Sequence, residues 1–323
     1  MKKYMYMLFP LYSISIVFSL SASSWMMIWM GMELNLLSFI FIILHEKTIL
    51  STESSMKYFM IQAMGSLIFL FAVSMSMIFY NETSLINAIV PPLALILKSG
   101  MAPLHSWTPP IVSKFSFLGM FMFLTWQKLV PLFILFSSWF SFITWIAFIN
   151  IIMGSVGGIT QSSLPKMMIF SSINNIGWML MSMMESVFLF FIFFSCYVVI
   201  NFLVIKFMSL FNIKWIIQIK SNKMNIKLYF FSFLMSLAGL PPFLGFLPKW
   251  LVIKKTWESI PLITFTAIIF SIFTLFFYLK SSVAMMIASS SMVKWNISPS
   301  LKMKLIFMMI TNSTSPFLFI VLT

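Results

Sequence analysis

The sequence predicts an all-α, polytopic membrane protein of about eleven transmembrane helices. We expect two inverted five-helix repeats, each with one broken helix. Three observations support this prediction. Apolar residues make up 61% of the 323-residue chain and charged residues only 8%, against about 25% charged residues in ordinary soluble domains. Apolar runs of about 20 residues, the length that crosses a bilayer, follow one another along the chain. Two of these runs contain glycine and several prolines, which interrupt helices.

The expected helices follow the apolar runs between polar or turn-forming residues. The run at 84–113 is longer than one simple span, in agreement with a broken helix. The helices leave no room for a separate soluble domain, so we expect a single membrane domain over residues 1–323. The helices are expected at about residues 4–22, 25–44, 56–80, 84–113, 116–136, 139–159, 166–184, 187–211, 228–253, 261–288 and 303–322.

Two stretches stand out inside apolar runs. Residues 98–110 read Lys-Ser-Gly-Met-Ala-Pro-Leu-His-Ser-Trp-Thr-Pro-Pro, and residues 239–249 read Gly-Leu-Pro-Pro-Phe-Leu-Gly-Phe-Leu-Pro-Lys. Broken backbone persists at membrane depth only where protein or a water-filled cavity surrounds it. Both stretches therefore indicate a hydrated interior. The residues expected to break the helices are Gly100, Pro103, Gly239, Pro241 and Pro242.

The two breaks fall in the fourth and ninth expected helices, five helices apart. Because five is odd, successive units of five helices have opposite orientations in the membrane. This arrangement is typical of inverted-topology repeats, whose broken helices flank a site near the bilayer midplane. We therefore predict a first repeat over 1–137, a second over 138–290 and an extra C-terminal helix over 291–323.

Lysines in the expected loops lie mostly on the side of the N-terminus. The opposite side holds only Lys254 and Lys255. Such asymmetry marks the cytoplasmic or matrix side, so the N-terminus is expected there and the C-terminus on the other side. The lysines expected on the N-terminal side are Lys2, Lys3, Lys47, Lys57, Lys114, Lys166, Lys214, Lys220, Lys223, Lys227, Lys294, Lys302 and Lys304.

Five titratable residues near the breaks or deep in spans are the candidate site. A lone charge at the bilayer centre costs at least about 2.5–3.5 kcal/mol, so Glu33 needs a partner, and Lys98 is the natural one. Lys128 has apolar runs on both sides, and a buried lysine can exchange protons near neutral pH. Lys249 follows the second break. His105 is a candidate relay, with a structural core histidine as the alternative.

Other site types find little support in the sequence. The single cysteine, Cys196, and two histidines cannot build an iron–sulfur cluster or a four-cysteine zinc site from this chain alone. The lysines are scattered singly, without the basic stripe of a nucleic-acid-binding protein. We therefore expect no metal and no cofactor in this chain, and no nucleic-acid partner.

Several stretches, in order from position 31 to 250, resemble the chain 2 family of NADH-ubiquinone oxidoreductase, the antiporter-like membrane subunits of mitochondrial complex I. Eleven helices are similar to the animal form of that family. The matching stretches are Gly31-Met-Glu-Leu-Asn-Leu-Leu, Lys98-Ser-Gly-Met-Ala-Pro-Leu-His-Ser-Trp, Thr125-Trp-Gln-Lys-Leu, Ser171-Ser-Ile-Asn-Asn-Ile-Gly-Trp and Leu237-Ala-Gly-Leu-Pro-Pro-Phe-Leu-Gly-Phe-Leu-Pro-Lys-Trp.

The resemblance implies proton translocation coupled to electron transfer from NADH to ubiquinone. Glu33, Lys98, Lys128 and Lys249 would form a charged axis along the membrane midplane. The chain would act within a multisubunit translocase, without redox catalysis of its own. NADH, FMN, iron–sulfur clusters and ubiquinone would be held by other subunits.

The resemblance also implies the protein's surroundings. The expected partners are the other membrane subunits of complex I, in a hetero-oligomer, and lipids. The expected location is the mitochondrial inner membrane, with the N-terminus on the matrix side and the C-terminus on the intermembrane-space side. Two alternatives stay open: a self-standing cation/proton antiporter, and a structural scaffold subunit without its own proton path.

Overall fold

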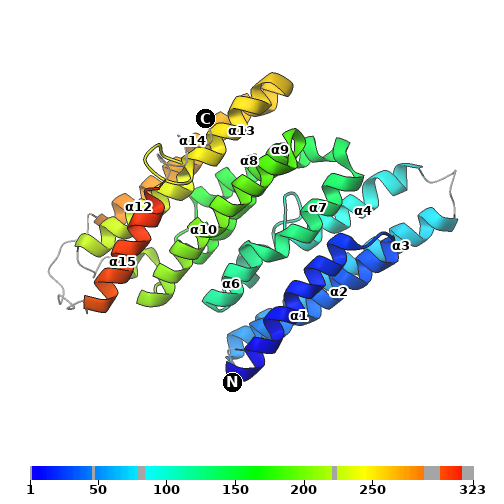
Figure 1. The fold of residues 1–323 in the computed structure, drawn as a ribbon, viewed down its shortest axis with the longest axis horizontal. Helices are drawn as coiled ribbons and strands as arrows, with labels where there is room; N and C mark the ends of the chain where they lie inside the picture. Colours follow the sequence, from blue (N-terminus) through cyan, green and yellow to red (C-terminus); the bar gives the residue numbers. More distant parts are fainter. Residues whose placement is uncertain (1, 46–47, 79–83, 220–223, 287–298, 315–323) are drawn as a thin grey trace. The chain divides into compact units, whose positions relative to one another are not determined.

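The computed structural model describes residues 2–45, 48–78, 84–219, 224–286 and 299–314 (Figure 1). Within these ranges the chain forms helices joined by turns, without a strand, which confirms the all-α prediction. The chain divides into two compact units, Met1–Ile146 and Ala147–Thr323. The predicted repeat boundaries at 137/138 and 290/291 stay a prediction, and the second of them lies outside the described residues.

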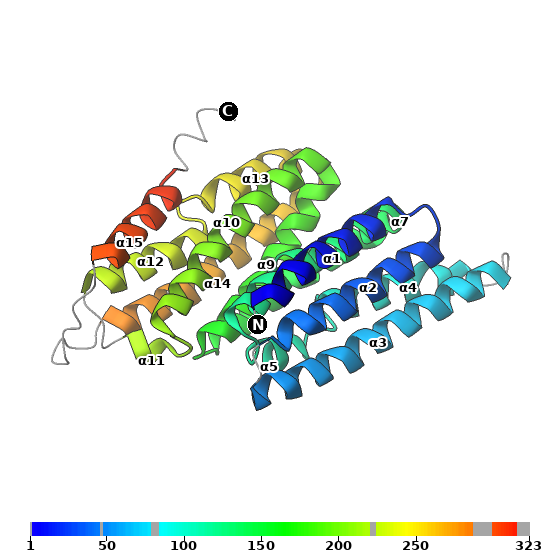
Figure 2. The same cartoon turned by 60° about the horizontal axis from the view of Figure 1, so that its bottom comes forward.

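The first unit is a bundle in which α1 packs on α2, α2 on α3 and α3 on α4, and in which α4 and α1 both contact α7. Figure 2 shows α1, α2 and α3 alongside one another. The helix α8, Phe140–Ile159, contains the boundary between the units. The elements before it are α1 (Lys2–Ser21), α2 (Trp25–Ile43), α3 (Ile49–Ile78), α4 (Ser84–Ser99), α5 (Thr108–Val112), α6 (Phe117–Leu124), the 3-10 turn η1 (Trp126–Lys128) and α7 (Leu129–Ser138).

An aromatic cluster around Tyr58 of α3 fills the interior of the first unit. The Tyr58 ring contacts Phe39 of α2 with ring centroids 5.3 Å apart, and also Trp107, Phe115 and Phe123. Most of these pairs meet edge to face, the arrangement that aromatic quadrupoles favour. The cluster thus packs α2 and α3 against the segment that follows the first helix break.

The second unit is built around α9, whose residues from Leu164 to Met183 are nearly all buried. This helix contacts α10 and α13, while α12 packs on α10, α14 and α15. A Cβ added at Gly154 of α8 would collide with the Asn174 backbone of α9, so these helices pack closely, as small residues in membrane helices allow. The elements are α9 (Leu164–Glu185), α10 (Val187–Phe211), α11 (Ile216–Ile219), α12 (Met224–Ala238), α13 (Phe246–Ser259), α14 (Pro261–Met286) and α15 (Pro299–Asn312).

Several of the helices are long and apolar enough to cross a membrane, which confirms a polytopic membrane protein. Shorter apolar helices cover Met7–Ser21, Ala88–Ser99 and Met224–Ala238. The number eleven stays a prediction. Within the described residues, the six long spans are Trp25–Ile43, Ile49–Met75, Phe117–Ser138, Phe140–Ile159, Val187–Phe211 and Pro261–Met286.

Four lysines expected in loops or at helix ends lie within helices, because the helices run further than the apolar runs. The helix α3 begins at Ile49, so Lys57 lies on a helix with an exposed side chain. The helix α12 begins at Met224, so Lys227 lies on it and is only 3% exposed. The helix α13 continues to Ser259, so Lys254 and Lys255 extend from its exposed face. The side chains of Lys2, Lys3, Lys47, Lys220, Lys223, Lys294, Lys302 and Lys304 lie outside the described part.

Candidate functional site

The first helix break lies between α4 and α5. The helix α4 ends at Ser99, and Gly100 follows with φ of 69°, a left-handed conformation that glycine adopts without strain. The Met101 N–H donates to the Ile96 carbonyl at 3.1 Å and closes the helix end. Pro103 and His105 lie in the turns before α5 begins at Thr108. Lys98 is therefore held in the last turn of a helix that stops inside the unit.

The break places Lys98 next to Glu33. Lys98 Nζ is 3.9 Å from Glu33 Oε1 on α2, and also 3.9 Å from Met32 Sδ. The Lys98 side chain is 5% exposed and that of Glu33 is 28% exposed. The predicted partners are thus in contact, at the long end of the ion-pair range. At this distance a modest movement of either helix forms or breaks the pair.

Three amide side chains surround this pair. Gln62 Nε2 of α3 donates to the Lys98 carbonyl at 2.8 Å, which satisfies an acceptor left open by the end of α4. Gln127 Nε2 donates to Asn35 Oδ1 of α2 at 3.0 Å. The sequence analysis did not identify any of these three residues as part of the site. Each is an uncharged amide inside an otherwise apolar span. A buried amide needs a polar partner, so this pattern could have indicated them as site residues.

Lys128 lies in a turn that interrupts its helix. The expected helix 116–136 is divided into α6, the 3-10 turn η1 and α7, and Lys128 is the last residue of η1. Its side chain is buried, with 2% exposure. The sequence carries a signal for this turn: Pro131 has no N–H and its ring clashes with the carbonyl four residues earlier, that of Gln127. Short 3-10 stretches within helices often mark hinges.

His105 lies on the break itself. Its Nδ1 is 3.2 Å from the Pro103 carbonyl oxygen, and its own carbonyl accepts hydrogen bonds from the Thr108 N–H at 3.0 Å and hydroxyl at 2.8 Å. These contacts show how the turn is held together. A role of His105 in proton relay stays a prediction.

The second break lies between α12 and α13, in the second unit. The helix α12 ends at Ala238, and Gly239 follows with φ of 87°, again left-handed. The predicted break residues Pro241 and Pro242 lie in the non-helical segment before α13 begins at Phe246. The Gly239 N–H donates to the Met235 carbonyl at 3.1 Å. The two breaks thus share a left-handed glycine at the end of a helix.

Lys249 folds back from the first turn of α13 onto the end of α12. Its Nζ donates to the Ala238 carbonyl at 2.9 Å and to the Leu237 carbonyl at 3.4 Å. The ammonium also lies 5.9 Å from the centroid of the buried Trp178 ring, within reach of a cation–π interaction. Helix C-termini carry a partial negative charge, so backbone carbonyls stabilise the cation here. Lys249 belongs to the second unit, whereas the other predicted site residues belong to the first.

A small cavity of about 20 Å³ adjoins Lys249. Its lining includes Asn175, Tyr197 and Ser236 beside the lysine. This volume holds about one water molecule, which needs about 10–15 Å³ and polar partners. Neutral polar groups therefore surround the second lysine, whereas a carboxylate adjoins Lys98.

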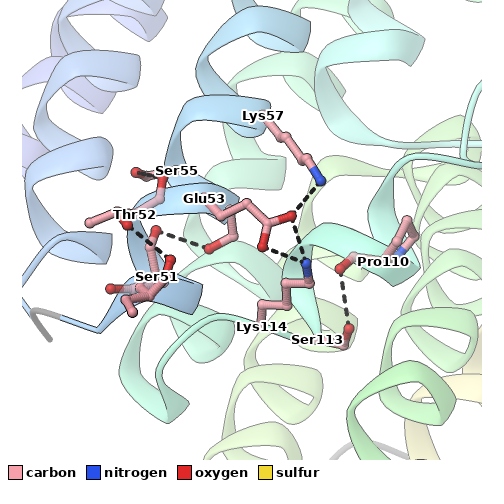
Figure 3. Close-up of polar contacts among 10 residues, drawn as sticks. Ser51, Thr52, Glu53, Ser55, Lys57, Pro110, Ser113 and Lys114 are labelled. Atoms are coloured by element: carbon pink, nitrogen blue, oxygen red, sulfur yellow. Dashed lines mark hydrogen bonds and ion pairs between the residues drawn. The ribbon is translucent and has the colours of Figure 1, made fainter.

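A third charged cluster lies at the start of α3 (Figure 3). Glu53 accepts from Lys114, which follows α5, with Nζ 2.9 Å from Oε1 and 3.0 Å from Oε2. Lys57 Nζ approaches the same Oε1 at 2.5 Å. The three side chains are 33% to 56% exposed. The cluster ties α3 to the connection between α5 and α6, outside the buried site.

We expect Glu53→Gln to speed thermal inactivation of the assembled protein slightly at low salt, because the amide loses both ion pairs. The effect should disappear at high salt, since exposed pairs are weak and screened. Inactivation rates at two ionic strengths measure it. The control is Glu258→Gln, an exposed carboxylate for which no ion pair occurs within the described residues. Equal rates for both variants at low salt would contradict the expected role of Glu53.

The fold and this site define a class of protein. Interrupted membrane helices are typical of secondary transporters, and ionisable side chains buried beside them mark ion or proton pathways. The family described as "NADH:quinone oxidoreductase/Mrp antiporter, TM" matches residues 22–277. A chain of respiratory complex I from Thermus thermophilus has the same fold, with a TM-score of 0.80 at 16% identity, over 96% of this chain and 77% of that one.

An Mrp complex from Dietzia has a chain of similar fold, with a TM-score of 0.73 at 17% identity over 90% of this chain and 61% of that one. Two curated relatives are closer in sequence, and both are NADH-ubiquinone oxidoreductase chain 2. That of Anopheles gambiae is 39% identical over 86% of this chain and 84% of its own, and that of Aedes aegypti is 37% identical with the same coverage. The chain belongs to the family of NADH-ubiquinone oxidoreductase chain 2.

Proposed function

We propose that this chain, a membrane subunit of respiratory complex I in the mitochondrial inner membrane, carries protons through Glu33, Lys98, Lys128 and Lys249. Their passage is coupled to electron transfer from NADH to ubiquinone. The observation that carries the proposal is the Lys98–Glu33 pair, two side chains 3.9 Å apart at a break inside a membrane helix bundle. Ionisable residues within membrane segments are rare and mark ion or proton pathways.

The pair acts as the adjustable element of the path. Two unit charges about 4 Å apart attract each other by about 4 kcal/mol at an effective dielectric constant of 20. This energy corresponds to about three factors of ten in a proton-binding equilibrium. Opening the pair therefore changes how firmly Lys98 holds its proton. The long 3.9 Å contact and the helix end behind Lys98 allow such an opening.

Lys128 is the central carrier in this proposal, and Lys249 passes protons on in the second unit. The burial of both lysines supports these roles, because ionisable side chains within membrane segments are rare and mark ion or proton pathways. Electron transfer takes place elsewhere in the complex. NADH, FMN, the iron–sulfur clusters and ubiquinone are held by other subunits, and this chain contributes no redox catalysis.

The N-terminus faces the matrix and the C-terminus the intermembrane space in this proposal. The excess of lysines in connections on the N-terminal side supports this orientation. This asymmetry is weaker than the sequence indicates for three lysines, because they lie on helices and not in connections: Lys227, Lys254 and Lys255. Attaching a protease site to either terminus and adding protease to mitoplasts tests the orientation directly.

Glu33→Gln tests the path. The amide keeps the shape of Glu33 but cannot change its charge, so we expect fewer protons moved per electron, with a partial rather than complete loss of this subunit's share. Proton uptake and NADH oxidation are measured together in sealed inner-membrane vesicles. Glu53→Gln is the matched control, because its carboxylate also pairs with lysines but lies outside the site. A lower amount of assembled complex with an unchanged ratio would instead indicate a scaffold role.

A further inference from the structure

The ammonium of Lys98 is held loosely by its neighbours in the first unit. The contacts that Nζ makes within the described part of the chain, with Glu33 Oε1 and Met32 Sδ, are both 3.9 Å long. A small cavity of about 20 Å³ lies beside the lysine, so the end of its side chain has room to move. The place of the ammonium therefore depends on what holds the backbone and the aliphatic stem of Lys98.

The backbone of Lys98 is held by α3. Because α4 ends at Ser99, the carbonyls of its last turn lack their regular helical partners. The chain itself closes part of this turn, since the Met101 N–H donates to the Ile96 carbonyl at 3.1 Å. The Lys98 carbonyl accepts instead from Gln62 Nε2 of α3 at 2.8 Å, and both residues are buried. Removing the donor of a buried carbonyl is costly, so this bond holds the last turn of α4 on α3.

The aliphatic stem of Lys98 packs on the same face of α3. Gly65 follows Gln62 by three residues, and residues three apart share a helix face. A Cβ placed at Gly65 would lie only 2.9 Å from Lys98 Cγ, so the stem lies directly against the backbone of α3. Because Nζ lies further along the side chain, a small displacement at Cγ moves the ammonium through a larger arc.

The second break shows the same packing with a different means of holding the lysine. A Cβ placed at Gly239 would lie 2.9 Å from Lys249 Cδ. There the ammonium itself is fixed, because it donates to the Ala238 carbonyl at 2.9 Å. At Lys98 the short bond is made by the backbone carbonyl, and Gln62 provides its donor.

On the basis of the proton path proposed above, we infer that Gln62 is a positioning residue for Lys98. Its bond to the Lys98 carbonyl holds the end of α4 on α3, with the stem against Gly65, where the ammonium faces Glu33. The amide of Gln62 carries no exchangeable charge of its own. Gln62 acts only through the separation of Lys98 from Glu33.

The test is Gln62→Met in the assembled complex, in sealed inner-membrane vesicles. Methionine has a similar length but no donor for the Lys98 carbonyl. We expect the protons moved per electron to fall as far as in Glu33→Gln, while NADH oxidation continues. The double variant should fall no further, because both changes act on the same pair. Gln62→Asn keeps the amide on a shorter side chain and serves if the methionine variant does not assemble; its ratio should also fall.

The matched control is Asn312→Leu. Asn312 is also a buried amide that donates to a backbone carbonyl of another helix, with Nδ2 3.2 Å from the Ser232 oxygen. Its bond joins α15 to α12 in the second unit. We expect this change to lower the amount of assembled complex, as Gln62→Met does, but to leave the ratio unchanged. An equal fall of the ratio in both variants would show that it follows stability and not the place of Lys98.

A density map of the assembled Gln62→Met complex is the second measurement. We expect Lys98 Nζ and Glu33 Oε1 to lie further apart than the 3.9 Å of the unaltered chain. An unchanged distance, or an unchanged ratio where Glu33→Gln lowers it, would overturn the role of Gln62 and leave the proton path standing. If Glu33→Gln also leaves the ratio unchanged, the path itself is wrong, and the map alone decides whether Gln62 positions Lys98.

Discussion

Replacing Lys128 by Met is expected to remove this subunit's share of proton pumping while NADH oxidation continues. Methionine has a similar length and flexibility and fills the same buried space, but it cannot bind a proton. Lys128 is 2% exposed, in a turn that interrupts its helix, so its side chain is shielded from bulk solvent. The measurement is the number of protons taken up per electron in sealed vesicles.

The matched control is Lys206→Met. Lys206 also lies within a membrane helix, α10, but its side chain is exposed and its Nζ lies 5.0 Å from the centroid of the Phe202 ring. Its loss should leave the ratio of protons to electrons unchanged. A normal ratio in Lys128→Met, with the complex fully assembled, would remove Lys128 from the path.

Gly245→Ala is expected to prevent stable assembly. A Cβ at this position would overlap the Ser236 carbonyl oxygen, a backbone atom that no rotamer change can move away. The helices α12 and α13 would have to separate, at a cost of about 3 kcal/mol or more. The separation would also pull Lys249 away from the Ala238 carbonyl. The amount of assembled complex in the membrane, and its temperature of inactivation, measure the effect.

Gly119→Ala is the comparison for Gly245→Ala. A Cβ at Gly119 would lie 3.2 Å from Ser116 Oγ and at least 3.6 Å from other atoms. A slight shift of the Ser116 side chain relieves that contact, and alanine favours the helix over glycine by about 1 kcal/mol. Near-normal assembly is therefore expected. Equal losses in both variants would show that close packing at Gly245 is not the cause.

The helix breaks and the Lys98–Glu33 contact could be predicted from the sequence because their causes are local. Glycine and proline interrupt a helix wherever they occur in the right pattern, and a charge deep in an apolar span requires a partner. Only one carboxylate, Glu33, lies far from an expected helix end. It was therefore the carboxylate predicted to pair with Lys98. The structure shows these two side chains 3.9 Å apart.

Other features depend on contacts between distant segments. The Asn35–Gln127 and Gln62–Lys98 bonds join residues 92 and 36 positions apart, and no local pattern specifies which amides meet. Burial of Lys227 follows from the helices that pack around α12, whereas its neighbours in sequence indicate a loop. The turn at Lys128 is an intermediate case, since Pro131 indicates a disturbance but not its form.

The two lysines at the helix breaks, Lys98 and Lys249, have different kinds of polar partner. The Glu33 carboxylate lies on a flexible side chain, 3.9 Å from Lys98 Nζ, so the electric field at Lys98 changes whenever either side chain moves. The carbonyls of Leu237 and Ala238 belong to the backbone at the end of α12, so their dipoles stay in place. Lys249 therefore rests against a constant field. A change in the surrounding charges therefore alters the contacts of Lys98 more readily than those of Lys249.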